Sequence, residues 1–244
     1  MSKTVVIHQP DFIPYPGFFH RFLHADLYLV LDHVKFVHKR GGRSWTHRDM
    51  VKSPAGARWL TLHVKKPPHD DTPIHDVELA PGDWRSEHLN LIREYYRPTP
   101  FFDEIYPGLE ALYARADARL MDCTMASIEL LSGWLDTPIP MVRSSTLAPV
   151  GRKTDLLVDL LRKVGATCYL SGVGARAFID EEVFRAAGVA LRWQEYTPQV
   201  YPQPYGAFVP NLSSIDVLFN CGIDGSRALL RRADAPASPT QDSV

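Results

Sequence analysis

Two neighbouring polar residues near the start of the chain, His8 and Gln9, are the first candidates for chemistry. Histidine titrates near neutral pH and can act as a general base, a general acid or a ligand. The pair follows a short apolar, β-branched run at residues 5–7, which is typical of a buried strand. Three prolines and one glycine then fall within residues 10–17, so neither a helix nor a central strand can continue there. We therefore expect His8 and Gln9 in a stiff loop at a strand end.

Asp32 occupies a comparable place after the next strand. It ends an apolar run at residues 27–31, which also favours a buried strand. In an open α/β sheet, polar residues at the carboxyl ends of strands line the crevice in which ligands bind. His8, Gln9 and Asp32 are therefore predicted to face one ligand site. A histidine that only caps backbone groups at the strand end fits His8 equally well, so both interpretations stay open.

A turn of small residues at 171–175 (Ser-Gly-Val-Gly-Ala) follows another strand-like segment. The backbone amides of such a turn can bind an anion where they open a helix. However, the glycine spacing is not that of a dinucleotide-binding turn, and no phosphate-binding lysine follows. Ser171 and Gly172 are candidates for substrate contacts, while an ordinary strand-to-helix turn also explains them.

Two side-chain amides near the end of the chain complete the candidates. Gln203 lies in an aromatic, proline-containing loop, which could stack on a base or sugar ring or form a packed surface turn. Ser213 and Asp216 fit a helix N-cap and its capping box, which accounts for both residues without a ligand. That explanation covers Asn220 less well, because Asn220 sits near the expected end of the same helix.

The histidines and cysteines indicate neither a metal site nor a nucleophilic thiol. His63, His69 and His75 have a regular spacing, but it matches neither helical i,i+4 ligands nor a zinc knuckle. Three cysteines are too few and too scattered for a disulfide framework. Cys168 and Cys221 lie in apolar surroundings, which is typical of buried structural thiols. We predict no metal site and reduced thiols.

The alternation of strand-like and helical patterns predicts an α/β fold with a mostly parallel sheet and flanking helices. The expected strands are residues 5–7, 27–31, 59–64, 75–79, 141–143, 167–170 and 189–193. The expected helices are residues 84–96, 101–113, 120–135, 154–164 and 180–187, with Thr154 as an N-cap. Residues 83–137 are interpreted as a helical insertion in a single domain of residues 1–230. The polar residues 231–244 are predicted to form a disordered tail.

Composition narrows the class of partner. The 27 Lys and Arg residues nearly balance the 28 Asp and Glu residues, giving a net charge of −1. This argues against a nucleic-acid groove and against attachment to an anionic membrane. No signal peptide opens the chain, and no run of about twenty apolar residues could span a bilayer. We expect a cytoplasmic protein whose partner is a small-molecule substrate.

Several motifs, taken in order, resemble the WbqC-like family. The first half contributes His8-Gln9-Pro10, Pro14, Gly17-Phe18-Phe19, Ala25-Asp26, Leu31-Asp32 and residues 44–48. The second half contributes residues 169–175, Tyr201-Pro202-Gln203 and residues 211–222. The resemblance therefore covers about residues 4–230. The sequence differs from the family pattern at Tyr15 and Asp49, where tryptophan and asparagine are usual.

The resemblance implies a role in bacterial surface-polysaccharide (O-antigen) or natural-product biosynthesis, by addition of an acyl or aminoacyl group, such as glycine, to an amine. It implies no particular cofactor, and ATP, coenzyme A and aminoacyl-tRNA all stay open. A fainter similarity connects the opening strand, loop and helix with pantothenate synthetases and nucleotidyltransferases. Both histidines of the HxGH signature of those enzymes are missing from residues 15–18.

We therefore hypothesise an enzyme that acylates an amine, for example on a nucleotide-linked amino sugar. Such a reaction needs a general base for the amine and donors for the developing oxyanion. His8 is expected as the base, Asp32 as its orienting partner or amine anchor, and Arg48 as the contact for a carboxylate or phosphate. The expected polar donors of the pocket are Gln9, Ser171, Gly172, Gln203 and Asn220. The alternatives are a non-catalytic sugar-nucleotide binding module and a cyclase or ligase acting on an unusual amino acid.

Overall fold

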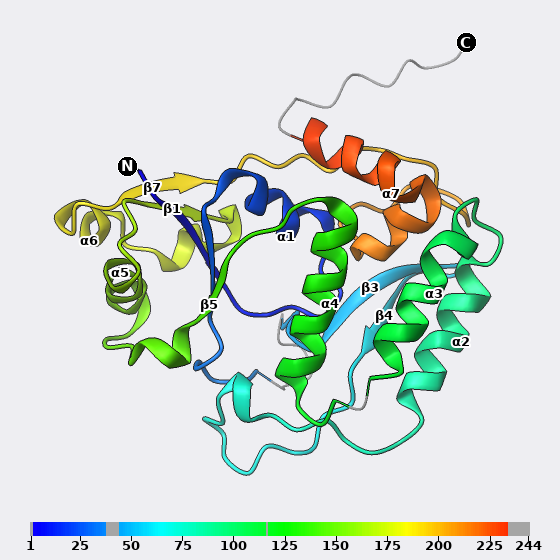
Figure 1. Ribbon diagram of the computed structural model, residues 1–244, viewed down its shortest axis with the longest axis horizontal. Helices are drawn as coiled ribbons and strands as arrows, with labels where there is room; N and C mark the ends of the chain where they lie inside the picture. Colours follow the sequence, from blue (N-terminus) through cyan, green and yellow to red (C-terminus); the bar gives the residue numbers. More distant parts are fainter. Residues whose placement is uncertain (1, 38–43, 116, 234–244) are drawn as a thin grey trace.

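Five parallel strands form the central sheet of the computed structural model, which describes residues 2–37, 44–115 and 117–233 (Figure 1). Their order across the sheet is β5-β2-β1-β6-β7. The strands are β1 (Thr4–His8), β2 (Leu27–Val30), β5 (Met141–Arg143), β6 (Cys168–Ser171) and β7 (Ala190–Trp193). The chain adds β2 and β5 on one side of β1 and then β6 and β7 on the other. The strand order therefore reverses between β1 and β6, where open α/β sheets leave a crevice for ligands.

Alternate residues of β1 pack into two different hydrophobic clusters. Val5 and Ile7 contact the cluster that includes the helices α5 (Lys153–Lys163) and α6 (Glu181–Ala186). Val6 belongs to the larger cluster on the opposite face. Because successive side chains of a strand point to opposite faces, a strand covered on both sides must be apolar throughout. This explains the continuous apolar runs of the strands. The parallel sheet with helices on both faces confirms the predicted α/β class.

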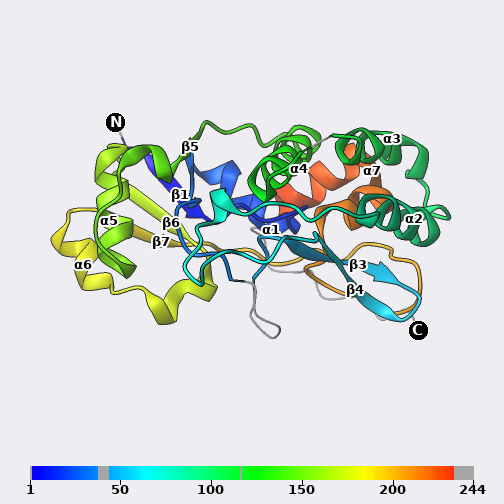
Figure 2. The same cartoon turned by 90° about the horizontal axis from the view of Figure 1, so that it is seen from below.

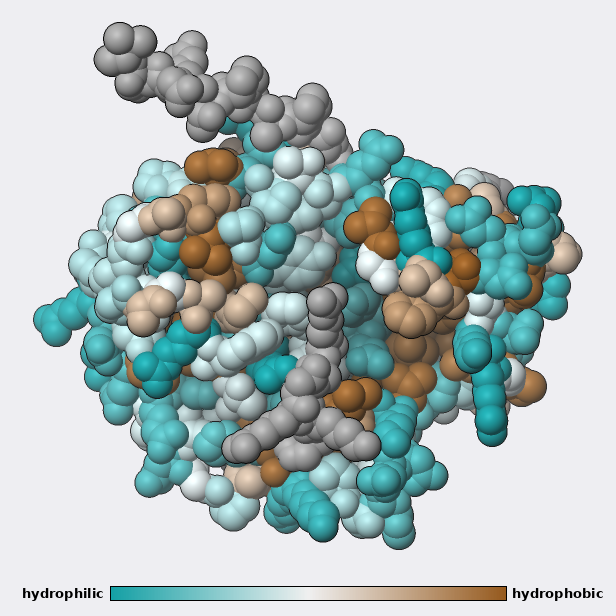
Figure 3. Space-filling model, turned by 180° about the vertical axis from the view of Figure 1, so that it is seen from behind, coloured by the Kyte–Doolittle hydropathy of each residue, from teal (hydrophilic) through white to brown (hydrophobic). Residues whose placement is uncertain are grey.

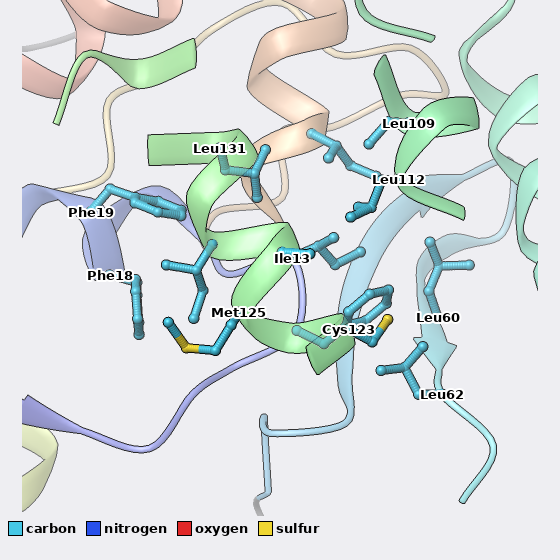
Figure 4. Close-up of a cluster of buried hydrophobic side chains, with 14 of the residues drawn as sticks. Ile13, Phe18, Phe19, Leu60, Leu62, Leu109, Leu112, Cys123, Met125 and Leu131 are labelled. Atoms are coloured by element: carbon cyan, nitrogen blue, oxygen red, sulfur yellow. The ribbon is translucent and has the colours of Figure 1, made fainter. Parts of the chain in front are cut away.

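Four helices and a β-hairpin lie at the other end of the molecule (Figure 2). The helices are α2 (Trp84–Tyr96), α3 (Phe102–Tyr113), α4 (Leu120–Leu135) and α7 (Ser214–Arg232), and the hairpin is β3 (Arg48–Ser53) with β4 (Gly56–Thr61). The larger hydrophobic cluster joins this end to the sheet. Figure 4 shows part of it, with Phe18 and Phe19 on one side of α4 and Leu60 and Leu62 on the other.

The structure differs from the sequence predictions at three elements. Strand β3 was missed because its buried positions include Asp49 and Lys52, so no apolar alternation marks it. The strand expected at residues 59–64 lies earlier, as β4. The strand expected at residues 75–79 is replaced by a 3-10 helix, Ile74–Asp76, followed by an isolated bridge at Leu79. The buried apolar residues there are held by contacts with distant segments, which periodicity does not reveal.

Two helix ends also differ from expectation. Helix α5 begins at Lys153 with Arg152 as N-cap, and the Thr154 hydroxyl instead accepts a hydrogen bond from the Asp180 amide. Helix α7 continues beyond Gly222, where the backbone kinks at a φ of 69°, and it reaches Arg232. Residues 231 and 232, expected in the tail, are therefore helical. Ala233 is a buried turn residue, and residues 234–244 of the predicted tail lie outside the described residues.

The kink at Gly222 provides a test of the packing between α7 and α3. We expect Gly222→Ala to lower the free energy of unfolding by about 2 kcal/mol or more, because a β-carbon requires a strained backbone conformation. That β-carbon would also lie 2.7 Å from the Phe101 ring. Gly133→Ala in α4 is the matched control, because a β-carbon at Gly133 would have no other atom within 4 Å. We expect this control to be neutral or stabilising by about 0.5–1 kcal/mol. Equal effects in urea unfolding would contradict the packing.

Candidate functional site

A cavity of about 530 Å³ lies at the carboxyl ends of β1 and β6, where the strand order reverses. Its lining comes from the ends of the strands, from the loop after β1, from the start of β3 and from the segment after β7. The lining residues are Ile7, His8, Asp11, Tyr15, Arg21, Trp45, Asp49, Tyr169, Ser171, Gly172, Val173, Gly174, Ala175, Phe178, Gln194 and Tyr196. The location is the one expected for a ligand site in an open α/β sheet.

His8, which lines this cavity, has one unprotonated ring nitrogen. Its Nδ1 atom lies 2.8 Å from the carbonyl oxygen of Gln9, and a carbonyl oxygen only accepts hydrogen bonds, so Nδ1 carries the proton. Burial, and then the positive charge of Arg21, lower the pKa of His8 to about 3, so the ring is neutral at pH 7. In a neutral ring with a proton on Nδ1, the Nε2 atom has a free lone pair. His8 can therefore accept a proton at Nε2.

Asp11 is the carboxyl group beside His8. Its Oδ2 atom lies 3.5 Å from His8 Nδ1, and the residue is only 5 % exposed. Burial raises the pKa of Asp11 to about 7, although the nearby Arg21 charge acts in the opposite direction. Near neutral pH the protonated and ionised forms of Asp11 are therefore both populated. A carboxylate next to Nδ1 is the arrangement that orients a catalytic imidazole and stabilises its charged form.

Burial favours the neutral form of a second carboxyl group of the lining, Asp49. The residue is 1 % exposed, and burial raises its pKa well above the usual range. Its Oδ1 atom accepts a hydrogen bond of 2.6 Å from the Met50 amide. The protonated form of aspartic acid has nearly the shape of asparagine, and the burial of Asp49 favours that form.

An aromatic wall depends on the absence of a side chain at Gly17. A β-carbon there would lie 2.3 Å from the Tyr15 ring and 2.9 Å from the Tyr196 ring, so both rings pack against the glycine. The two tyrosine rings also contact each other, with centroids 6.0 Å apart. Gln194 also holds the backbone of Gly17 in place, because its Nε2 atom donates to the Gly17 carbonyl at 2.7 Å. Only glycine at position 17 allows this wall to close.

The structure brings some of the predicted site residues together. Ser171 and Gly172 line the cavity with His8, and the Ser171 hydroxyl donates to the Tyr169 hydroxyl at 3.3 Å. Gln9 lies next to His8 but does not line the cavity, and its Oε1 atom accepts from the Thr46 hydroxyl at 3.1 Å. The ends of β1 and β6 therefore meet at one site, as expected for parallel neighbours.

Asp32 lies outside the cavity and does not orient His8, contrary to the sequence prediction. Its carboxylate accepts hydrogen bonds from the Ser144 hydroxyl at 2.9 Å, the Ser145 amide at 2.8 Å and the Ser145 hydroxyl at 2.7 Å. The residue is fully buried and is not part of the cavity lining. Its bonds join the end of β2 to the turn after β5. The carboxyl group beside His8 is Asp11 instead.

Arg48 also lies outside the cavity lining. Its Nε atom donates to the Ser44 carbonyl at 3.3 Å, and its guanidinium carbon lies 4.3 Å from the centre of the Trp59 ring. These contacts hold the start of β3 against the segment that leads into it. The cavity receives Trp45 and Asp49 from the same region.

Gln203 and Asn220 belong to a separate cluster around Asp216. The Asp216 carboxylate accepts hydrogen bonds from Tyr96 at 2.6 Å, Tyr201 at 2.8 Å and Gln203 at 2.7 Å, so it does not complete a capping box. Asn220 donates to the Asp216 carbonyl one turn earlier in α7, at 2.8 Å. The residues around Asp216 therefore do not share the cavity with His8.

The start of α7 is hydrogen-bonded to the backbone of the loop after His8. The Ser213 hydroxyl donates to the Ile13 carbonyl and the Ser214 hydroxyl donates to the Pro14 carbonyl, each at 2.6 Å. Ser213 also caps α7, as predicted, by accepting from the Ile215 amide. The start of α7 therefore fixes the loop that carries Asp11 and Tyr15 into the cavity.

Sequence reasoning left two residues of the lining, Asp11 and Arg21, without an assigned role. Asp11 is three residues after His8 in a proline-rich loop, a spacing that could have indicated their contact. Arg21 is a charged residue among phenylalanines and is only 3 % exposed. An arginine in a helical segment rich in phenylalanine could have indicated a buried cation at a functional site, because charged residues are rarely fully buried without a partner.

The match to known proteins begins directly after His8 and runs through the C-terminal motifs. The model of the WbqC-like protein family matches residues 9–228. The chain belongs to the WbqC-like protein family. It is similar to the uncharacterized protein Rv1507c of Mycobacterium tuberculosis, with 26% identity over 224 residues, 91% of this chain and 95% of that protein. No solved structure matches the chain.

The part of the chain that the structure describes contains neither a membrane-spanning helix nor a metal-binding cluster. No helix within residues 2–37, 44–115 and 117–233 has both the length and the apolar character to cross a bilayer. In the same ranges, no three His, Cys, Asp or Glu side chains gather as a metal site would require.

The raised pKa of Asp11 predicts a pH dependence of stability. The folded protein keeps a proton up to pH of about 7 that the unfolded chain releases near pH 4, so stability from this group falls as the pH rises between these values. Between pH 5 and pH 8 the loss is about 2–3 kcal/mol. We expect Asp11→Asn to remove this part of the pH dependence in urea unfolding. If the free energy of unfolding changed with pH in the same way in both proteins, Asp11 would be ionised in the folded protein over this pH range.

Proposed function

We propose that this protein is a transferase that adds an acyl or aminoacyl group, such as glycyl, to an amine of a small molecule bound in the cavity. The acceptor is an amino sugar or a natural-product intermediate. Membership of the WbqC-like family supports the biosynthetic context. The observation that carries the proposal is the neutral His8 ring, with a lone pair on Nε2 and the Asp11 carboxyl beside Nδ1.

The reaction requires one bond to form and one to break, with a proton moved between them. The neutral amine attacks the carbonyl carbon of the acyl donor, and the new C–N bond forms as the proton passes from the amine to His8 Nε2. The bond to the leaving group then breaks, and Nε2 returns the proton to the departing atom. Ionised Asp11 stabilises the positively charged imidazole between these steps. His8 and Asp11 together therefore supply the acid and base functions.

The end of β6 and the turn that follows it supply donors for the developing negative charge on the carbonyl oxygen. The Tyr169 hydroxyl accepts from Ser171, so its own proton is available to a ligand. The adjoining turn at residues 172–175 contributes backbone to the same lining. Donors fixed before the reaction and shielded from water stabilise such an oxyanion effectively. Tyr169 and the turn are therefore assigned to the carbonyl oxygen of the donor, and Ser171 orients the Tyr169 hydroxyl.

The acyl donor and acceptor can be identified by thermal-shift measurements, followed by mass spectrometry. The panel contains dTDP, UDP, ATP, coenzyme A and free amino acids, because a ligand that binds only the folded protein raises its unfolding midpoint. Compounds that raise the midpoint are then combined with amine acceptors, and the acylated product is sought by its mass. Tight binding of a sugar nucleotide without any transfer would instead favour a non-catalytic binding module.

We expect His8→Gln to reduce the rate of transfer by about 100-fold or more, because glutamine cannot accept the proton. Substrate binding, measured by titration calorimetry, is expected to change little. His69→Gln is the matched control, since His69 lies in an exposed loop outside the cavity. The wild-type rate is expected to rise with pH through about 7, as Asp11 ionises. Full activity of His8→Gln would exclude His8 as the base.

A further inference from the structure

Arg21 carries a buried positive charge at the edge of the cavity. The residue is 3 % exposed and begins a 3-10 helix, Arg21–His24, that directly follows α1 (Pro16–His20). Its Nε atom is buried without a hydrogen-bond partner among the described residues. Within the same part of the chain, its guanidinium group forms no ion pair and contacts the Phe18 ring at 5.3 Å. A buried charge in this state opposes folding, because it has lost water without gaining an anion.

The guanidinium group of Arg21 faces the cavity. Arg21 is part of the lining, together with His8, Asp11 and Ser171. Its Nη1 atom lies 3.9 Å from the place of a β-carbon on Gly172, so it reaches the turn after β6. Its positive charge acts on groups from several segments, lowering the pKa of His8, Asp11 and Tyr169. Arg21 therefore shares the cavity with residues from the carboxyl ends of both β1 and β6.

Neither carboxyl group of the cavity forms an ion pair with Arg21. Among the described residues, Asp11 lies against His8 Nδ1, and Asp49 accepts a hydrogen bond from the Met50 amide. The arginine expected from the sequence to hold an anion, Arg48, instead packs on Trp59 and lies outside the lining. An arginine presents a rigid fork of N–H donors that fits a carboxylate or a phosphoryl group. An anion in the cavity is the partner that Arg21 lacks.

We propose that Arg21 binds an anionic group of the ligand, a carboxylate or a phosphoryl group, at the junction of β1 and β6 beside His8. This assignment builds on the proposed transfer reaction and specifies its substrate class, because the acyl donor or the acceptor must then be an anion. It also couples binding to catalysis. An anion on Arg21 offsets the charge that weakens His8 as a base, so His8 becomes more basic when the site is occupied.

Two small anions test the assignment on the full chain. Inorganic phosphate represents the phosphoryl source and acetate represents the carboxylate source, and each is titrated against the wild-type protein by thermal shift at constant ionic strength. At least one of the two is expected to raise the unfolding midpoint. The anion that gives the larger shift identifies the source. If neither anion raises the wild-type midpoint, the assignment is overturned.

Arg21→Gln is expected to weaken binding of the active anion by about 10- to 100-fold, the effect of losing charged hydrogen bonds. Arg185→Gln is the matched control, since Arg185 is an exposed arginine on α6 paired with Glu182. The control is expected to bind as the wild type does. Without anion, Arg21→Gln is expected to unfold at the same midpoint as the wild type or a higher one. Unchanged binding by Arg21→Gln, or equal losses in both variants, overturns the assignment.

Arg21→Lys decides the question if Arg21→Gln does not fold. Lysine keeps the positive charge but not the forked donors, so the affinity is expected to fall by about tenfold. Wild-type affinity in Arg21→Lys overturns the assignment. The transfer reaction is tested separately by mass spectrometry. Anion binding through Arg21 without any acyl transfer would contradict the proposed function alone, whereas transfer with wild-type anion binding in Arg21→Gln would contradict this assignment alone.

Discussion

Parallel pairing of β1 with both β2 and β6 is the constraint on which the site depends. The strand order reverses between β1 and β6, so the chain leaving His8 borders a crevice that no neighbouring connection fills. The proline-rich loop crosses this crevice in a fixed path, and hydroxyl groups at the start of α7 hold its carbonyls. The start of α7 therefore contributes to the cavity indirectly, by fixing the position of this loop.

Exclusion of water gives the cavity its electrostatic character. Burial favours the neutral forms of His8, Asp11 and Asp49, while the charge of Arg21 cannot be discharged in the same way. The cavity thus combines one fixed positive charge with groups that prefer to be neutral. Such an arrangement opposes folding locally and favours an anionic ligand, as expected where function rather than stability selects the residues.

Hydrophobic surface borders the polar cavity on its outer side. Phe178, which belongs to the lining, is 80 % exposed, and Val173 is 58 % exposed. Both residues lie in the 3-10 helix Val173–Phe178 that follows β6. Hydrophobic patches are also evident beside the hollow on the face of the molecule in Figure 3. A ligand with both a charged group and an apolar part matches this combination better than a small inorganic ion does.

The sequence by itself determined the fold class, most helices and the loop that follows β1, because periodicity and proline placement are local signals. Thus residues 84–96 and 120–135 were predicted as helices with the observed bounds. Only the tertiary structure decided which polar residues meet. Asp32 and Gln203 satisfy their hydrogen bonds elsewhere, whereas Asp11 and Arg21 line the cavity with His8. Contacts between distant segments, and the loss of water on burial, leave no periodic trace in the sequence.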